Sequence, residues 1–139
     1  MRYDEKPGTP AASDQVDRDA AVASRLITIV VHERGPSSAI VEVTGEIDML
    51  TAPRLQAAFG DLLGRGHQIV VADLSRVLFL GSSGLAVLIS AHQEAADRGG
   101  QFRLVSPGPP VARTIEATGL TGLFTTFGSL HEATSDLPA

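Results

Sequence analysis

Two adjacent serines between glycines have the residue type and the position to do chemistry in this chain. The turn Gly81-Ser82-Ser83-Gly84 follows a continuous apolar run and precedes a stretch with helical periodicity. The start of a helix leaves backbone N–H groups without partners and carries the positive end of the helix dipole. Small hydroxyl residues there can cap the helix or face a partner. The sequence therefore predicts an exposed corner that tolerates an anion.

The spacing of this turn argues against catalysis. A serine nucleophile of the hydrolase type needs Gly-x-Ser-x-Gly, which is absent here, and no suitable Asp and His follow at strand ends. His131 falls in a predicted terminal helix and is a poor base. Glu46 and Asp48 lie close in one loop, but nothing around them indicates the raised pKa of a catalytic carboxyl. The glycine patterns of phosphate-binding loops are also absent. We therefore predict that the chain is not an enzyme.

Composition limits the class of protein further. The 139 residues, 43% of them hydrophobic, are enough for one sizeable core. The net charge of −5 gives no basic field to hold a polyanion, which argues against nucleic acid and anionic membranes as partners. No apolar run approaches the roughly 20 residues that cross a bilayer, and the N-terminus lacks the apolar region of a secretory signal. A cytoplasmic location is therefore expected.

No metal or cofactor site is predicted. The chain has no cysteine, which excludes disulfides, thiol catalysis and thiolate ligands. His32 stands at a predicted strand end, where no partner ligands accompany it at metal-site spacing. His92 falls on the inner face of a predicted helix. We expect it to be a partly buried imidazole with its hydrogen bonds made, and a proton switch is the alternative.

The elements that must position the serine turn alternate between strands and helices. The sequence predicts a flexible tail at 1–24, then strands at 26–32 and 39–45 joined by a turn, and a loop at 45–53 before a helix that ends at 64–66. A strand at 68–73 follows, with a short link to the serine turn, and then a helix from Ser82 or Ser83 to about 98. The last predicted elements are a strand at 101–105, a helix opened by 106–110, a short strand near 127 and a helix from 129. The first two strands read as an antiparallel pair. This order indicates one α/β domain with a mixed sheet.

Two predicted helices flank the strand that leads to the serines. Thr51 is the expected N-cap of the first, with Pro53 in its first turn. Its apolar face comprises Leu55, Phe59, Leu62 and Leu63. The inner face of the second comprises Leu85, Leu88, Ile89, His92 and Ala96. Asp48, in the loop before the first helix, either binds nearby backbone N–H groups or serves as an acidic contact beside the serines.

Two separated segments resemble the STAS domain family, named for sulphate transporters and anti-sigma factor antagonists. Residues 43–52, VTGEIDMLTA, are similar to its GELD..TA segment, and residues 71–88 are similar to its DLS.V.F.DSSGL..L segment. The likeness runs from about Leu26 to about Asp136. It implies a mixed β-sheet with an N-terminal antiparallel strand pair and about four helices, in a STAS domain at 25–139.

The resemblance also implies a function. Because no transmembrane segment precedes the domain, the chain is similar to the stand-alone bacterial antagonists. In these, an anti-sigma factor that is also a serine kinase phosphorylates the first serine of the motif. The unphosphorylated antagonist binds that factor and frees a sigma factor, and a PP2C-type phosphatase resets it. Carried over, Ser82 is the phosphoacceptor and Asp48 an acidic contact, while Thr51, Ser83 and Gly84 shape the same surface.

One position departs from the family pattern. The family usually has Asp before the phosphoacceptor, and this chain has Gly81, which removes a charge and adds backbone freedom. Partner binding is expected to survive, whereas recognition of Ser82 by a kinase stays open. Two alternatives remain at this stage: a STAS subunit of a larger assembly, stressosome-like or for lipid transport, without phosphorylation, and a small-ligand sensor that binds a nucleotide or anion at Asp48 and Ser82.

Overall fold

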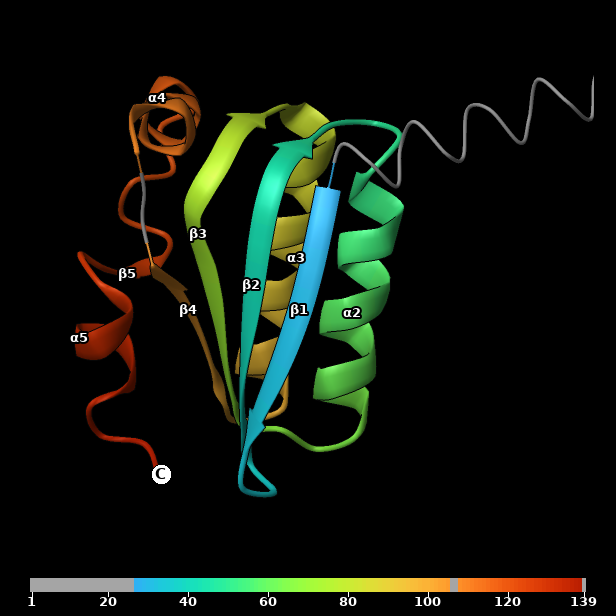
Figure 1. Cartoon of the computed structure of the whole chain (residues 1–139), viewed down its shortest axis with the longest axis vertical. Coiled ribbons are helices and arrows are strands. Elements are labelled where there is room, and N and C mark those ends of the chain that lie inside the picture. The colour runs from blue at the N-terminus through green and yellow to red at the C-terminus, as the bar shows by residue number, and fades with distance from the viewer. Residues whose placement is uncertain (1–26, 106–107, 139) are drawn as a thin grey trace, which may run out of the picture.

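The computed structural model describes residues 27–105 and 108–138, so the predicted tail at 1–24 lies outside the described residues. Within them, five strands form one sheet in the order β1-β2-β3-β4-β5, with α2 to α5 packed around it (Figure 1). The elements are β1 (Ile27–Arg34), β2 (Ser38–Ile47), α2 (Ala52–Gly64), β3 (Ile69–Leu80), α3 (Ser82–Asp97), β4 (Gln101–Val105), α4 (Pro109–Ala117), β5 (Thr125–Phe127) and α5 (Leu130–Thr134).

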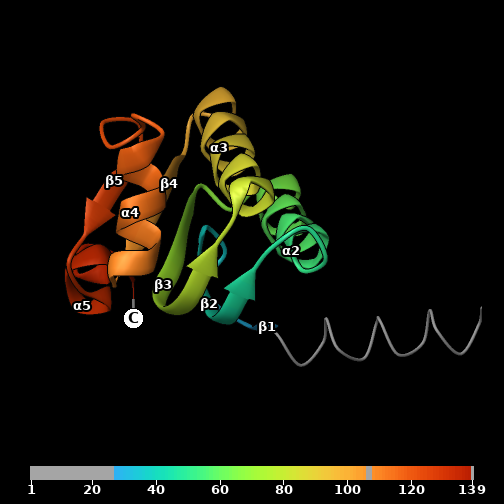
Figure 2. The same ribbon diagram turned by 90° about the horizontal axis from the view of Figure 1, so that it is seen from above.

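The sheet is mixed, as predicted. β1 pairs antiparallel with β2, and each later neighbour pairs in parallel. The hairpin turn is shorter than expected because pairing extends to Arg34 and Ser38. α2 and α3 cover one face of the sheet, and α5 packs against the other (Figure 2). The expected α/β fold, with its N-terminal antiparallel pair and about four helices, is confirmed for the described residues.

The helices bury the faces that the periodicity predicts, with one correction. All four predicted core residues of α2 are buried, and the Phe59 ring meets Phe102 of β4 edge-on at 5.1 Å between centroids. On α3 the predicted Ala96 is exposed, and Ala91 and Ala95 are buried instead. The buried face of α3 is shifted because this helix contacts α2 as well as the sheet.

β3 is longer than the sequence indicated. The prediction ended this strand at Asp73 and placed a link before the serines, but the strand continues to Leu80 alongside β2. Two register shifts interrupt the β2–β3 ladder in this stretch. Such irregularities disturb the alternation of side chains. Beyond Asp73 the buried positions therefore recur every third residue, at Leu74, Val77 and Leu80.

An ion pair ties the C-terminal segment to the sheet. Arg103 of β4 is buried and donates two hydrogen bonds to the Asp136 carboxylate, at 2.8 and 3.0 Å. It also donates to the backbone oxygen of Ala133, and its guanidinium lies over the Phe127 ring. The hydrogen bonds from Arg103 lower the pKa of the Asp136 carboxyl. α5 is thus held by a charge-assisted clamp as well as by apolar contacts.

We expect Asp136→Asn to reduce stability in a pH-dependent way. Because the folded state holds this proton less readily than the unfolded chain, the ion pair stabilises the fold fully above about pH 4 and is lost as pH falls through the folded pKa. Thermal midpoints of wild type and variant should therefore differ at pH 7 and converge in acid. Asp97→Asn, at an exposed position of α3, is the matched control. A difference that grows on acidification would contradict the assignment.

Candidate protein-binding site

The serine turn lies where β3 passes into α3. Gly81 occupies the N-cap position with extended backbone, φ −89° and ψ 179°, and its N–H donates to the Ile47 carbonyl at 2.9 Å. Ser82, the first residue of α3, is exposed, and Ser83 is half-buried. The loops that follow β2 and β3 therefore meet at one corner of the molecule.

The two serines do not cap the helix. The local alternative, in which a serine hydroxyl satisfies the first N–H groups of α3, is wrong, because Gly81 takes the N-cap position and no side chain makes a capping hydrogen bond there. The first turn of α3 also carries no acidic residue. An anion at Ser82 would therefore meet the positive end of a 16-residue helix.

Asp48 is engaged within its own loop. Its Oδ1 accepts hydrogen bonds from the backbone N–H groups of Leu50, at 2.9 Å, and Thr51, at 3.0 Å. The interpretation of Asp48 as a loop carboxylate that binds backbone N–H groups is confirmed. The carboxylate fixes the loop between β2 and α2, and its side chain is half-buried. A direct contact between Asp48 and a partner stays a prediction.

Thr51 occupies the predicted N-cap position of α2 but does not cap with its side chain. Its hydroxyl donates to the Glu46 carbonyl at 2.7 Å and accepts from the N–H of Asp48 at 2.9 Å. Capping side chains usually belong to residues with extended backbone, whereas Thr51 is helical, with φ −95° and ψ −24°. The hydroxyl therefore points back to the loop and stabilises it.

Two of the predicted binding residues lie below the surface. Thr51 has no exposed area, and Gly84 is buried on the inner side of the first turn of α3. A Cβ atom at position 84 would lie 2.5 Å from Cγ2 of Ile47 and 2.7 Å from Cδ1 of Leu80. Both residues therefore shape the corner from beneath, and their part in partner binding stays a prediction. Gly81, Ser82 and Ser83 remain at or near the surface.

Two exposed apolar pairs flank the corner, and sequence reasoning missed them. Met49 and Leu50 follow β2, with 76% and 55% of their surface exposed. Leu78 and Phe79 lie near the end of β3, with 69% and 50% exposed. The sequence does contain a signal for these exposed residues, because each apolar pair stands next to polar loop residues. Exposed apolar surface around a polar centre is typical of a protein-binding site.

A groove between α2 and α3 continues this surface. It encloses about 320 Å³ and runs beside the serine turn. Met49 and Pro53 line it from one side, and Ser83, Ala86 and Ser90 line it from the other. The corner therefore has an apolar surface on its helical side as well as at the end of β3.

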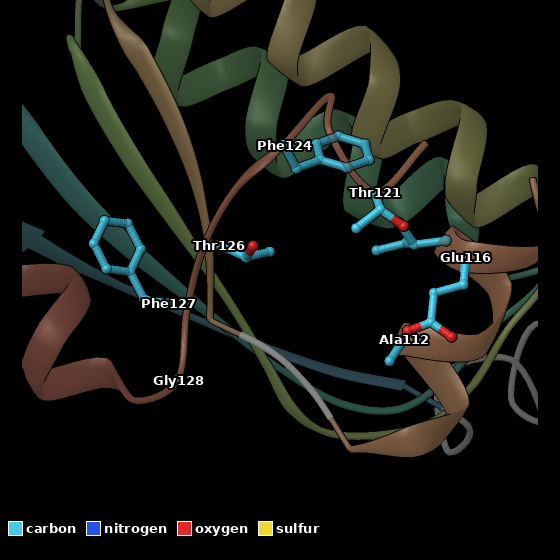
Figure 3. A pocket seen from close by; sticks show the side chains of 8 residues that line it. Ala112, Glu116, Thr121, Phe124, Thr126, Phe127 and Gly128 are labelled. Carbon is cyan, nitrogen blue, oxygen red and sulfur yellow. The ribbon is translucent and has the colours of Figure 1, made fainter. Parts of the chain in front are cut away.

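A second hollow lies away from these residues, between α4 and β5. This pocket of about 380 Å³ has neither Asp48 nor Ser82 in its lining. Figure 3 shows the Thr126 side chain turned toward the same space as Thr121 and Glu116, while Phe127 points to the opposite side of β5. Its chemistry differs from the nucleotide or anion site predicted as an alternative, because the only charged lining residue is acidic.

The histidines of the described ranges are not at the corner. His67, which sequence reasoning missed, is buried at the other end of β3, with Nδ1 3.0 Å from the Leu62 carbonyl and Nε2 2.9 Å from Glu33. His92 is partly buried as predicted and packs on Phe124, but its Nδ1 has no hydrogen-bond partner among the described residues, so that part of the prediction is corrected.

Neither a metal site nor a membrane span is found in the described part of the chain. No group of three or more His, Asp or Glu side chains there could hold a metal ion. Among the helices of those residues, none has the length and apolar character to cross a bilayer.

The fold and the corner define a small α/β domain that presents a serine at a helix start, beside one exposed apolar pair in the loop after β2 and another near the end of β3. The family model described as the STAS domain matches residues 28–133. The chain therefore belongs to the STAS domain family, and the resemblance noted in the sequence is confirmed.

Two similar proteins place the chain within this family, and a third shares its fold. It is 36% identical over 107 residues to the anti-sigma-F factor antagonist RsfB of Mycobacterium tuberculosis, a match that covers 77% of this chain and 86% of that protein. A crystal structure of an anti-sigma factor antagonist from Mycobacterium paratuberculosis has a TM-score of 0.71 at 38% identity, covering 78% of this chain and 92% of that one. The phosphorylated form of the Bacillus cell fate determinant SpoIIAA has a TM-score of 0.63 at 17% identity, covering 78% and 97%, which shows the common fold.

Proposed function

We propose that this chain is an anti-sigma factor antagonist that acts by binding and not by catalysis. In this proposal the unphosphorylated chain binds an anti-sigma factor of the serine-kinase type and so releases a sigma factor. Phosphorylation at Ser82 ends the interaction, and a PP2C-type phosphatase restores it. The names of the relatives at 36% and 38% identity support the class of partner.

The observation that carries the proposal is the state of Ser82. Its side chain is exposed on the first residue of α3 and takes no part in capping the helix. The exposed pair Met49-Leu50 follows β2, and the exposed pair Leu78-Phe79 lies near the end of β3, so both adjoin the same corner. A kinase can therefore reach the hydroxyl in the free domain, and a partner that covers the apolar pairs would also cover it.

Phosphate at this position would act at the interface and not on the fold. It adds about −1.5 to −2 charges at a helix N-terminus, where free N–H groups and the helix dipole favour an anion. The domain should therefore stay folded. A partner packed over the corner would meet a dianion that has lost its water, which disfavours the complex.

The test is intact-mass spectrometry after incubation with ATP and each candidate serine-kinase anti-sigma factor from the same genome. We expect one phosphate, lost in Ser82→Ala and retained in Ser83→Ala. The Ser83 variant is the matched control because it removes the neighbouring hydroxyl. The same proteins are then used in a pull-down with and without ATP.

The outcomes distinguish the remaining readings. No phosphate with any partner, together with retained binding, would show that Gly81 accompanies an antagonist controlled in another way. Absence of both phosphate and binding would contradict the proposed function. Copurification with transporter subunits would then favour a STAS subunit of a larger assembly.

A further inference from the structure

We infer that Phe79 anchors the partner on this surface and that Gly81 positions its ring. The inference rests on the proposed function, because the partner is the anti-sigma factor. It deepens that function by naming the side chain the partner must bury and the reason for glycine beside Ser82.

Phe79 has the exposure and the placement of an anchor. Half of its surface is exposed although it belongs to a paired strand, next to Leu80, which is buried. It lies opposite Glu46 on the β2–β3 ladder and three residues before Ser82. Aromatic side chains that are exposed in the free protein and buried in the complex often dominate binding. No other phenylalanine in the described ranges is an exposed large hydrophobic residue.

The backbone does not explain the glycine at position 81. Its φ of −89° and ψ of 179° are values that any residue adopts. The side-chain environment does explain it. A Cβ atom there would lie 3.1 Å from Cε2 and 3.4 Å from Cζ of Phe79, and beyond its two chain neighbours the next atom is the Ile47 carbonyl oxygen at 3.7 Å.

The Phe79 ring thus occupies the space beside position 81. A side chain at that position must push the ring, which is free to turn because it is half-exposed. Because Gly81 has no side chain, the Phe79 ring can lie in the space next to Ser82 and form an aromatic surface there. The partner chemistry that fits is an apolar pocket for one ring beside a polar group that receives the Ser82 hydroxyl.

The test is a double-mutant cycle with the anti-sigma factor that the pull-down identifies. We expect Phe79→Ala to weaken binding by about 30-fold or more. Gly81→Ala should weaken binding on the order of fivefold in the wild-type chain and have no further effect in the Phe79→Ala chain, because its action passes through the ring. Phe79→Tyr, which keeps the ring, should bind more tightly than Phe79→Ala does.

Two controls separate positioning from general damage. Val31→Ala removes an exposed apolar side chain of β1, paired with Val41 and away from the serine corner, and should change affinity by less than about threefold. In the free protein, the aromatic NMR signals of Phe79, assigned by their absence in Phe79→Ala, should shift in Gly81→Ala while the thermal midpoint stays unchanged.

The results also separate this inference from the proposed function. If Ser82→Glu abolishes binding but Phe79→Ala does not weaken it, the anchor is overturned and the function stands. An equal effect of Gly81→Ala in both backgrounds, or unshifted Phe79 signals, would overturn the positioning role. If the wild type binds no anti-sigma factor, both are overturned.

Discussion

Ser82→Glu should weaken binding of the anti-sigma factor by more than about a hundredfold while the domain stays folded. The carboxylate is placed on an exposed first residue of α3, where the helix dipole favours it, so unfolding free energy should change by less than about 1 kcal/mol. In the complex the same charge is covered by the partner. If losing its water costs on the order of 3 kcal/mol, affinity falls by about two powers of ten.

The matched control for this variant is Gln93→Glu. It adds the same charge at an exposed position of the same helix, away from the serine corner. Isothermal titration calorimetry gives the affinities and thermal unfolding gives the stabilities. Equal weakening by both variants would mean that net charge, and not position, controls binding. A large loss of stability in Ser82→Glu would contradict the view that the first turn of α3 accommodates an anion.

Most of the fold was predictable because it follows from local patterns. The apolar positions of α2 recur at helical spacing, and the final helix begins as its Ser129–Glu132 pattern predicts, with the Ser129 hydroxyl accepting from the N–H of Glu132. The second half of β3 was missed because its buried residues come every third position. That period arises from register shifts against β2, which depend on a neighbour far away in sequence.

The position of Ser82 could be predicted from the sequence, but the roles of the residues around it could not. The sequence located Ser82 correctly at a strand-to-helix turn, because a change from apolar run to helical period is a local signal. The burial of Gly84 and the exposure of Phe79 depend on how β2, β3 and α3 pack together. No spacing rule reports such contacts, so the roles of these two residues had to come from the structure.

Gly84→Ala should destabilise the domain by up to about 2 kcal/mol and also weaken partner binding. Alanine gains about 1 kcal/mol in helix propensity over glycine. Against this, its Cβ would stand 2.5 Å and 2.7 Å from atoms of Ile47 and Leu80, which are buried and cannot move aside easily. Overpacking of this kind costs typically about 1–3 kcal/mol. Relief of the clash would shift the start of α3, and Ser82 with it.

Gly60→Ala is the control, because the same substitution at this position should raise the stability of the domain and not lower it. Gly60 lies inside α2, and a Cβ atom there would have no other atom within 4 Å. The same substitution should therefore stabilise the domain by roughly 0.5–1 kcal/mol. Urea unfolding of both variants measures the two changes directly. If Gly84→Ala were as stable as Gly60→Ala, the close approach of α3 to the sheet would not be what places the serines. The corner would then be held by hydrogen bonds, those of Asp48 and Thr51 within their loop and that from Gly81 to Ile47.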